Sequence, residues 1–129
     1  MTRVLLVLCA GAVAAAAPLF AHHSFAAYYF EEQSVTITGE VVEFDYRSPH
    51  AWLHVSAPDP SGQVRRYAAE WANPNRLNQQ GVTRETLRPG DRVVVTGSPG
   101  RTASEYRLHL KGITRPADGW NWRGGRNRR

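Results

Sequence analysis

The sequence predicts an all-β domain with one short helix, arranged as a five-stranded OB-like Greek-key barrel. Apolar and polar residues alternate along five short segments, which is the period of half-buried strands. The one helix signal falls between the third and fourth of these segments, the position that a helix takes in the OB fold. Closure into a barrel would also remove exposed strand edges. The alternatives are an open β-sandwich and an SH3-like barrel.

Three strands are expected before the helix. Gly39 interrupts the first of them and the alternation breaks at Val41-Val42, which predicts a bulge or a tight bend in that strand. Because successive side chains point to opposite faces, the second strand should turn Ala51, Leu53 and Val55 one way and His50, Trp52 and His54 the other. The three strands are expected at residues 35–44, 50–55 and 64–71.

The helix is bounded by clear signals. Asn73 can cap it, Pro74 suits its first position, and Gly81 can end it. A Pro-Gly-Asp turn at residues 89–91 then leads back into the sheet. The last two strands are expected at residues 93–97 and 106–113.

Residues 1–21 are expected to form a cleavable signal peptide. Arg3 is followed by an uncharged apolar run, and Ala21 is a small residue at the expected cut. The run is shorter than the roughly 20 apolar residues that cross a membrane. The sequence therefore predicts a periplasmic or secreted protein with no transmembrane segment after processing.

The rest of the chain divides into a domain at residues 22–114 and a basic tail at 115–129. The domain holds as many basic as acidic residues, so the high pI of about 10.0 arises from the tail. The tail has no apolar period and is expected to be disordered. The only cysteine, Cys9, lies in the leader, which excludes thiol catalysis and cysteine-based metal sites from the processed protein.

The histidines suggest a metal site. Cleavage after Ala21 would make His22 and His23 the first two residues, and an N-terminal histidine offers its α-amine and its ring nitrogen together. Copper(II) favours nitrogen ligands in a plane, and His50 and His54 share one face of the second strand. These four histidines predict a copper site of the histidine-brace type, with copper ahead of zinc or nickel. The alternative is that all four are ordinary solvated residues, and His109 is assigned no role.

Trp52 and Glu70 are further candidates, on the barrel face that carries His50. Glu70 is expected either to pair with an arginine at the surface or to accept a hydrogen bond that orients a ligand histidine. A second hypothesis is therefore a metal-free envelope module that binds a protein partner or a small ligand around His50, Trp52 and Glu70.

No catalytic motif is found, which disfavours an enzyme. The near-neutral domain disfavours nucleic acid as a partner.

Several segments together resemble a bacterial domain-of-unknown-function family of small exported proteins. The matching segments are His22-His23-Ser24-Phe25, Ser48-Pro49-His50-Ala51-Trp52, Glu70, Pro74-Asn75-Arg76-Leu77, Gly81 to Leu87, and Pro89-Gly90-Asp91. Ser48 stands where the family usually has Asn, and Val82 where it usually has Trp. The resemblance implies export and a barrel-like domain, and it directs attention to His22, His23, His50 and Glu70.

Overall fold

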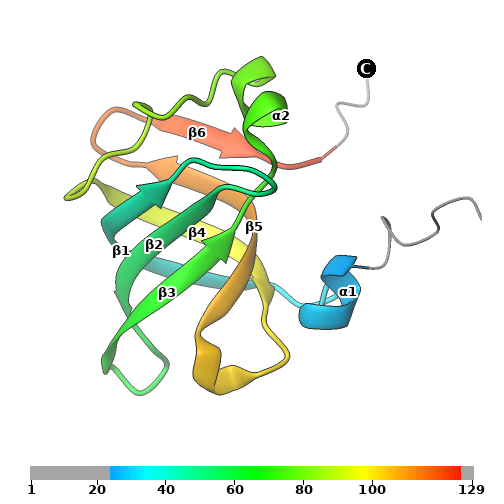
Figure 1. Ribbon diagram of the computed structural model, residues 1–129. Coiled ribbons are helices and arrows are strands. Elements are labelled where there is room, and N and C mark those ends of the chain that lie inside the picture. The colour runs from blue at the N-terminus through cyan, green and yellow to red at the C-terminus, as the bar shows by residue number, and fades with distance from the viewer. Residues whose placement is uncertain (1–23, 126–129) are drawn as a thin grey trace, which may run out of the picture.

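A closed five-stranded barrel forms the centre of the protein (Figure 1). The structure is a computed structural model that describes residues 24–125. The barrel strands are β1 (Val35–Asp45), β2 (Trp52–Pro58), β3 (Val64–Glu70), β4 (Arg92–Pro99) and β5 (Arg107–Arg115). Helix α2 (Pro74–Gln79) connects β3 to β4, so the expected order of strands and helix is confirmed.

Pairing of β3 with β5 closes the sheet. Neighbouring strands follow the order β3-β2-β1-β4-β5 and are antiparallel throughout that run. The closing pair is parallel, with Ala68 opposite Arg107 and Glu70 opposite His109. These pairings confirm the predicted OB-like barrel, and they place residues from β2, β3 and β5 side by side on the outer surface.

The alternation along the strands separates the core from the surface. Leu53 and Val55 of β2 and Val93 and Val95 of β4 are all fully buried. Trp71, just beyond β3, is 1% exposed and is the largest fully buried side chain among the described residues. The residues between them point outward, so the faces predicted for the second strand are confirmed.

The irregularity expected in the first strand occurs in two places. The pairing of β1 with β2 skips a residue between Val41 and Glu43, which is the bulge. Gly39 serves a different purpose, because a Cβ there would lie 2.0 Å from the carbonyl oxygen of Ser56. The glycine therefore permits close approach of β2 rather than forming the bulge itself.

Helix α2 has the ends that the sequence predicts. The side chain of Asn73 accepts a hydrogen bond of 2.9 Å from the backbone N–H of Arg76, and Pro74 occupies the first turn. Gly81 follows the helix with a positive φ of 80°, the left-handed region in which glycine is favoured. Leu77 is fully buried and fixes the helix against the barrel.

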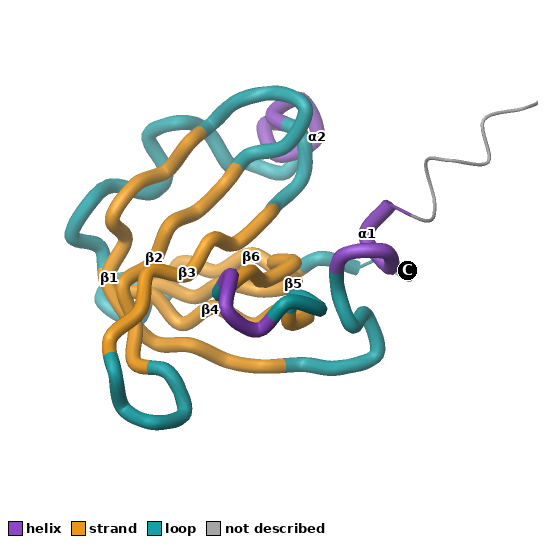
Figure 2. The backbone as a smooth tube through the Cα atoms, turned by 60° about the horizontal axis from the view of Figure 1, so that its bottom comes forward, coloured by secondary structure: helices purple, strands orange, loops and turns teal. Residues whose placement is uncertain are grey.

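The structure corrects the expectation of one helix. A second helix, α1 (Ser24–Tyr28), precedes β1. It lies beside the ends of β4 and β5 (Figure 2). Two hydrogen bonds hold it there: Phe30 N–H donates to the carbonyl of Pro99 at 2.9 Å, and Arg101 N–H donates to the carbonyl of Tyr28 at 2.8 Å. A helix of five residues is too short to produce a helical period in the sequence.

The structure also corrects the expectation of a disordered tail from residue 115. Strand β6 (Trp120–Arg123) pairs with β5, and the Trp122 ring packs edge-on against Trp71 at a centroid distance of 5.0 Å. Trp120 and Trp122 alternate with polar residues, a signal that the glycines and arginines around them obscured.

The expected signal peptide and residues 126–129 lie outside the described residues. No helix in the described part is long and apolar enough to cross a membrane.

Candidate functional site

Glu70 is the centre of a polar cluster on the outer surface of the barrel. It is the last residue of β3, and its side chain is only 12% exposed. Its carboxylate accepts hydrogen bonds from Tyr29 Oη at 2.5 Å, His50 Nδ1 at 2.8 Å and Arg107 Nη2 at 3.4 Å. Burial, followed by the hydrogen bond to Glu70, raises the pKa of Tyr29, so this hydroxyl keeps its proton and remains a donor. The carboxylate is therefore fixed by three partners from three segments of the chain.

The bond to Glu70 determines which nitrogen of His50 is available. A carboxylate can only accept, so Nδ1 of His50 carries the proton that it donates. In the neutral ring, Nε2 then keeps its lone pair. A metal-binding histidine usually has this arrangement, with a carboxylate on the nitrogen that does not bind the metal.

His109, on β5, has the same arrangement. Its Nδ1 lies 2.6 Å from Oε1 of Glu31, and the other oxygen of Glu31 pairs with Lys111 Nζ at 2.5 Å. Burial lowers the pKa of His109, which favours the neutral ring that metals bind. Burial alone would raise the pKa of Glu31, but hydrogen bonds from Lys111 and His109 lower it overall, so its carboxylate stays charged.

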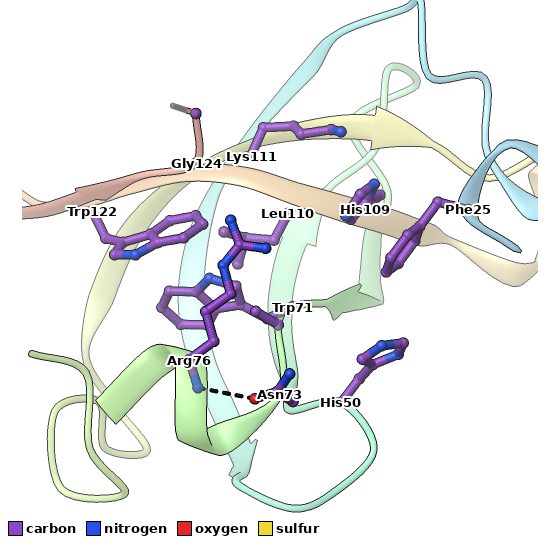
Figure 3. Close-up of a pocket in the computed structure, with 12 residues that line it drawn as sticks. Phe25, His50, Trp71, Asn73, Arg76, His109, Leu110, Lys111, Trp122 and Gly124 are labelled. Carbon is purple, nitrogen blue, oxygen red and sulfur yellow. Dashed lines mark hydrogen bonds between the residues drawn. The ribbon is translucent and has the colours of Figure 1, made fainter. Parts of the chain in front are cut away.

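Phe25 packs next to both imidazoles. Its ring stacks on His109 with the centroids 3.8 Å apart and an angle of 2° between the planes. It lies 5.3 Å from the ring of His50. Figure 3 shows the three rings together at one end of a cavity. Helix α1 thus carries the start of the described chain to the two histidines whose Nδ1 atoms are held by carboxylates.

Trp52 and Glu70 are brought together as the sequence predicts. They are directly opposite each other in the pairing of β2 with β3. The guanidinium of Arg107 lies over the Trp52 ring at 5.0 Å and also reaches Glu70. The Arg66 side chain, which shares a strand face with Glu70, pairs with Glu43 instead.

His54 is not brought to His50. It lies opposite Glu43 of β1, and burial followed by the nearby Arg66 lowers its pKa. Four residues of extended chain span about 13 Å, so the two rings belong to different parts of the surface. Within residues 24–125 no three His, Cys, Asp or Glu side chains form a ready metal site. His22 and His23 lie outside the described residues.

Sequence reasoning missed five residues of the cluster: Phe25, Tyr29, Glu31, Arg107 and His109. The sequence placed His109 on a polar strand face between Arg107 and Lys111 and indicated nothing further. The missing information was the parallel pairing of β3 with β5, which sets Glu70 and His109 side by side. An OB-like barrel closes by pairing its third strand with its fifth. The predicted fold could therefore have indicated that His109, on the fifth strand, lies near Glu70, on the third.

Comparisons with known proteins identify a family. Residues 8–109 match a family described as a family of unknown function, DUF6152. No curated protein matches the chain. Two crystal structures of the mitochondrial single-stranded DNA binding protein Rim1 from S. cerevisiae are similar, with 20% and 21% identity and TM-scores of 0.46 and 0.43. They cover 72% and 73% of this chain, and 96% and 97% of their own. Likeness at this level carries no conclusion about a ligand.

Proposed function

Because this chain belongs to the DUF6152 family, whose function is unknown, we propose a function from its own residues. The proposed function is copper binding by an exported protein. The site joins the N-terminal histidine to His50 and His109, and the role is capture or delivery of the metal. His109 thereby replaces His54 as the second ligand from the barrel.

The observation that carries this proposal is the matched arrangement of His50 and His109. Each ring directs Nδ1 to a buried or half-buried carboxylate, Glu70 or Glu31, and leaves Nε2 for another partner. Such outer carboxylates orient ligand histidines and strengthen them as bases. His50, just before β2, and His109, on β5, are both held in this way beside Phe25, which is how outer carboxylates hold the histidines of metal sites.

The remaining nitrogens would come from the start of the processed chain. Phe25 touches both barrel histidines and follows His23 by two residues in the sequence. Consecutive Cα atoms are about 3.8 Å apart, so a connection of this length would allow the N-terminal histidines to reach the site. The amine and ring of His22, together with imidazoles from the barrel, form an all-nitrogen set of the kind that copper(II) favours.

The test compares two forms of the protein that differ by one residue. Protein purified after natural export, with its first residue fixed by intact mass, is expected to bind one Cu(II) per chain in competition with a chelator. A form with one additional alanine before His22 loses the amine chelate. We expect its affinity for Cu(II) to fall by at least about tenfold. Mutating a residue that only hydrogen-bonds a metal ligand already lowers affinity by about 10–100-fold.

Equal affinities of the two forms would contradict the proposal. That result would favour the alternative, a metal-free module that binds a protein partner or small ligand on the face of His50, Trp52 and Glu70. The alternative uses the same surface but places no demand on a free amine at residue 22. A failure of natural export, or processing elsewhere than after Ala21, would also contradict the proposed site.

A further inference from the structure

A cavity of about 400 Å³ extends from the candidate site toward α2 and β6. Phe25, Trp71 and Trp122 supply aromatic walls, and Figure 3 shows the two tryptophan rings at the end away from His50 and His109. Its volume lies in the range of small-molecule pockets, which are apolar with a few placed polar groups. The aromatic walls favour a flat, unsaturated ligand.

The polar groups of this cavity are cationic or neutral. Arg76 and Lys111 line it, and no aspartate or glutamate does. The charge of Lys111 is matched by Glu31. In the described part of the chain no carboxylate lies within ion-pair distance of Arg76. The guanidinium of Arg76 is therefore the cation available to a ligand, and a guanidinium prefers a carboxylate or another planar anion.

A buried donor in the cavity wall points to the same chemistry. Trp71 is 1% exposed, and its Nε1–H has no acceptor among the described residues. The ring faces the cavity beside Trp122 and Arg76 (Figure 3). An unpaired buried donor costs about 1–3 kcal/mol, and native proteins rarely leave one. The nitrogen has less than 1 Å² of accessible surface, so an acceptor oxygen on a bound ligand would satisfy it once the side chains around it shift.

We propose that this cavity binds a small aromatic carboxylate. The ring of the ligand packs against Trp122 at the tryptophan end of the cavity, and its carboxylate accepts from Trp71 Nε1 and pairs with Arg76. This binding goes beyond copper binding and does not require a metal, because neither Trp71 nor Arg76 is a metal ligand. The N–H of Trp71 thus orients the ligand carboxylate, and the charge of Arg76 makes the cavity select an anion over a neutral ligand.

The test uses benzoate and benzamide, which share a shape and differ in charge. Each is titrated into metal-free full-length processed protein and followed by NMR. Benzoate is expected to bind saturably, and benzamide about tenfold or more weakly, a difference of about 1.4 kcal/mol. Equal binding of the two, or no binding of benzoate, would overturn the proposal.

Three variants locate the binding. Arg76→Gln, at an exposed helix position, should weaken benzoate about tenfold and leave benzamide unchanged. Trp71→Phe keeps an aromatic ring but removes the N–H, and it should also weaken benzoate. Arg84→Gln is the matched control, because Arg84 lies over Tyr46 outside the cavity, and it should have no effect. Retention of benzoate affinity in Arg76→Gln would refute the proposed site.

The two proposals fail separately. The form with one additional N-terminal alanine is expected to lose copper affinity and to keep its affinity for benzoate. If that form loses benzoate binding, the proposed independence from the amine is wrong. If the natural form binds benzoate and no copper, only the copper proposal is wrong.

Discussion

Replacing His109 with alanine is expected to weaken Cu(II) binding by more than about 100-fold. The change removes a ligand itself, and loss of only an outer partner already costs about 10–100-fold. His109 meets the conditions for a ligand: its Nδ1 is held by Glu31 at 2.6 Å, and burial lowers its pKa. The measurement is chelator competition on naturally processed protein at pH 7.

His54→Ala is the matched control for this prediction. His54 is a histidine on the same barrel, but it lies beside Glu43 and Arg66 and away from the cluster around Phe25. Its replacement should leave copper affinity within about twofold, a change of less than about 0.5 kcal/mol. A larger loss in His54→Ala than in His109→Ala would restore the ligand set expected from the sequence and contradict the one proposed from the structure.

Ending the chain at Arg115 is expected to lower the free energy of unfolding by about 3 kcal/mol. The truncation removes β6 and with it Trp122, whose ring packs 5.0 Å from Trp71 and whose Nε1–H donates to Gln80 at 2.9 Å. Removing a large aromatic side chain from a packed position costs about 3–5 kcal/mol, and Trp122 is only partly buried. Urea unfolding monitored by circular dichroism measures the change.

A chain ending at Gly125 is the control for the truncation. It keeps all of β6 and should match the full processed chain in stability. Equal stability of the chains ending at Arg115 and Gly125 would show that β6 contributes nothing, as the expectation of a disordered tail implies. Trp122→Ala alone should reproduce most of the loss, because that side chain makes the contact with Trp71.

Local signals made most of the barrel predictable. Burial on one face imposes a period of two on each strand, and the ends of α2 depend on neighbours in sequence, such as Asn73 capping the N–H of Arg76. Helix α1 was missed because five residues hold little more than one turn. Strand β6 was missed because its burial depends on Trp71, which is far away in the sequence.

The candidate site was harder to predict because it depends on pairing between distant strands. His50 and His54 are close in sequence, yet four residues of extended chain separate them by about 13 Å. Glu70 and His109 are far apart in sequence, yet they sit opposite each other on strands that run about 4.8 Å apart. The sequence was therefore sufficient to propose His50 and Glu70 as site residues. His109 could be added only once the pairing of β3 with β5 was known.

The central claim is that His50 and His109, and not His54, are the copper ligands of the barrel. The most direct measurement is the imidazole ¹H–¹⁵N spectrum of naturally processed protein, recorded while Cu(II) is added below one equivalent. Paramagnetic broadening is expected first at the ring signals of His50 and His109, with His54 still sharp. Broadening of His54 ahead of His109, or of no barrel histidine at all, would contradict the claim.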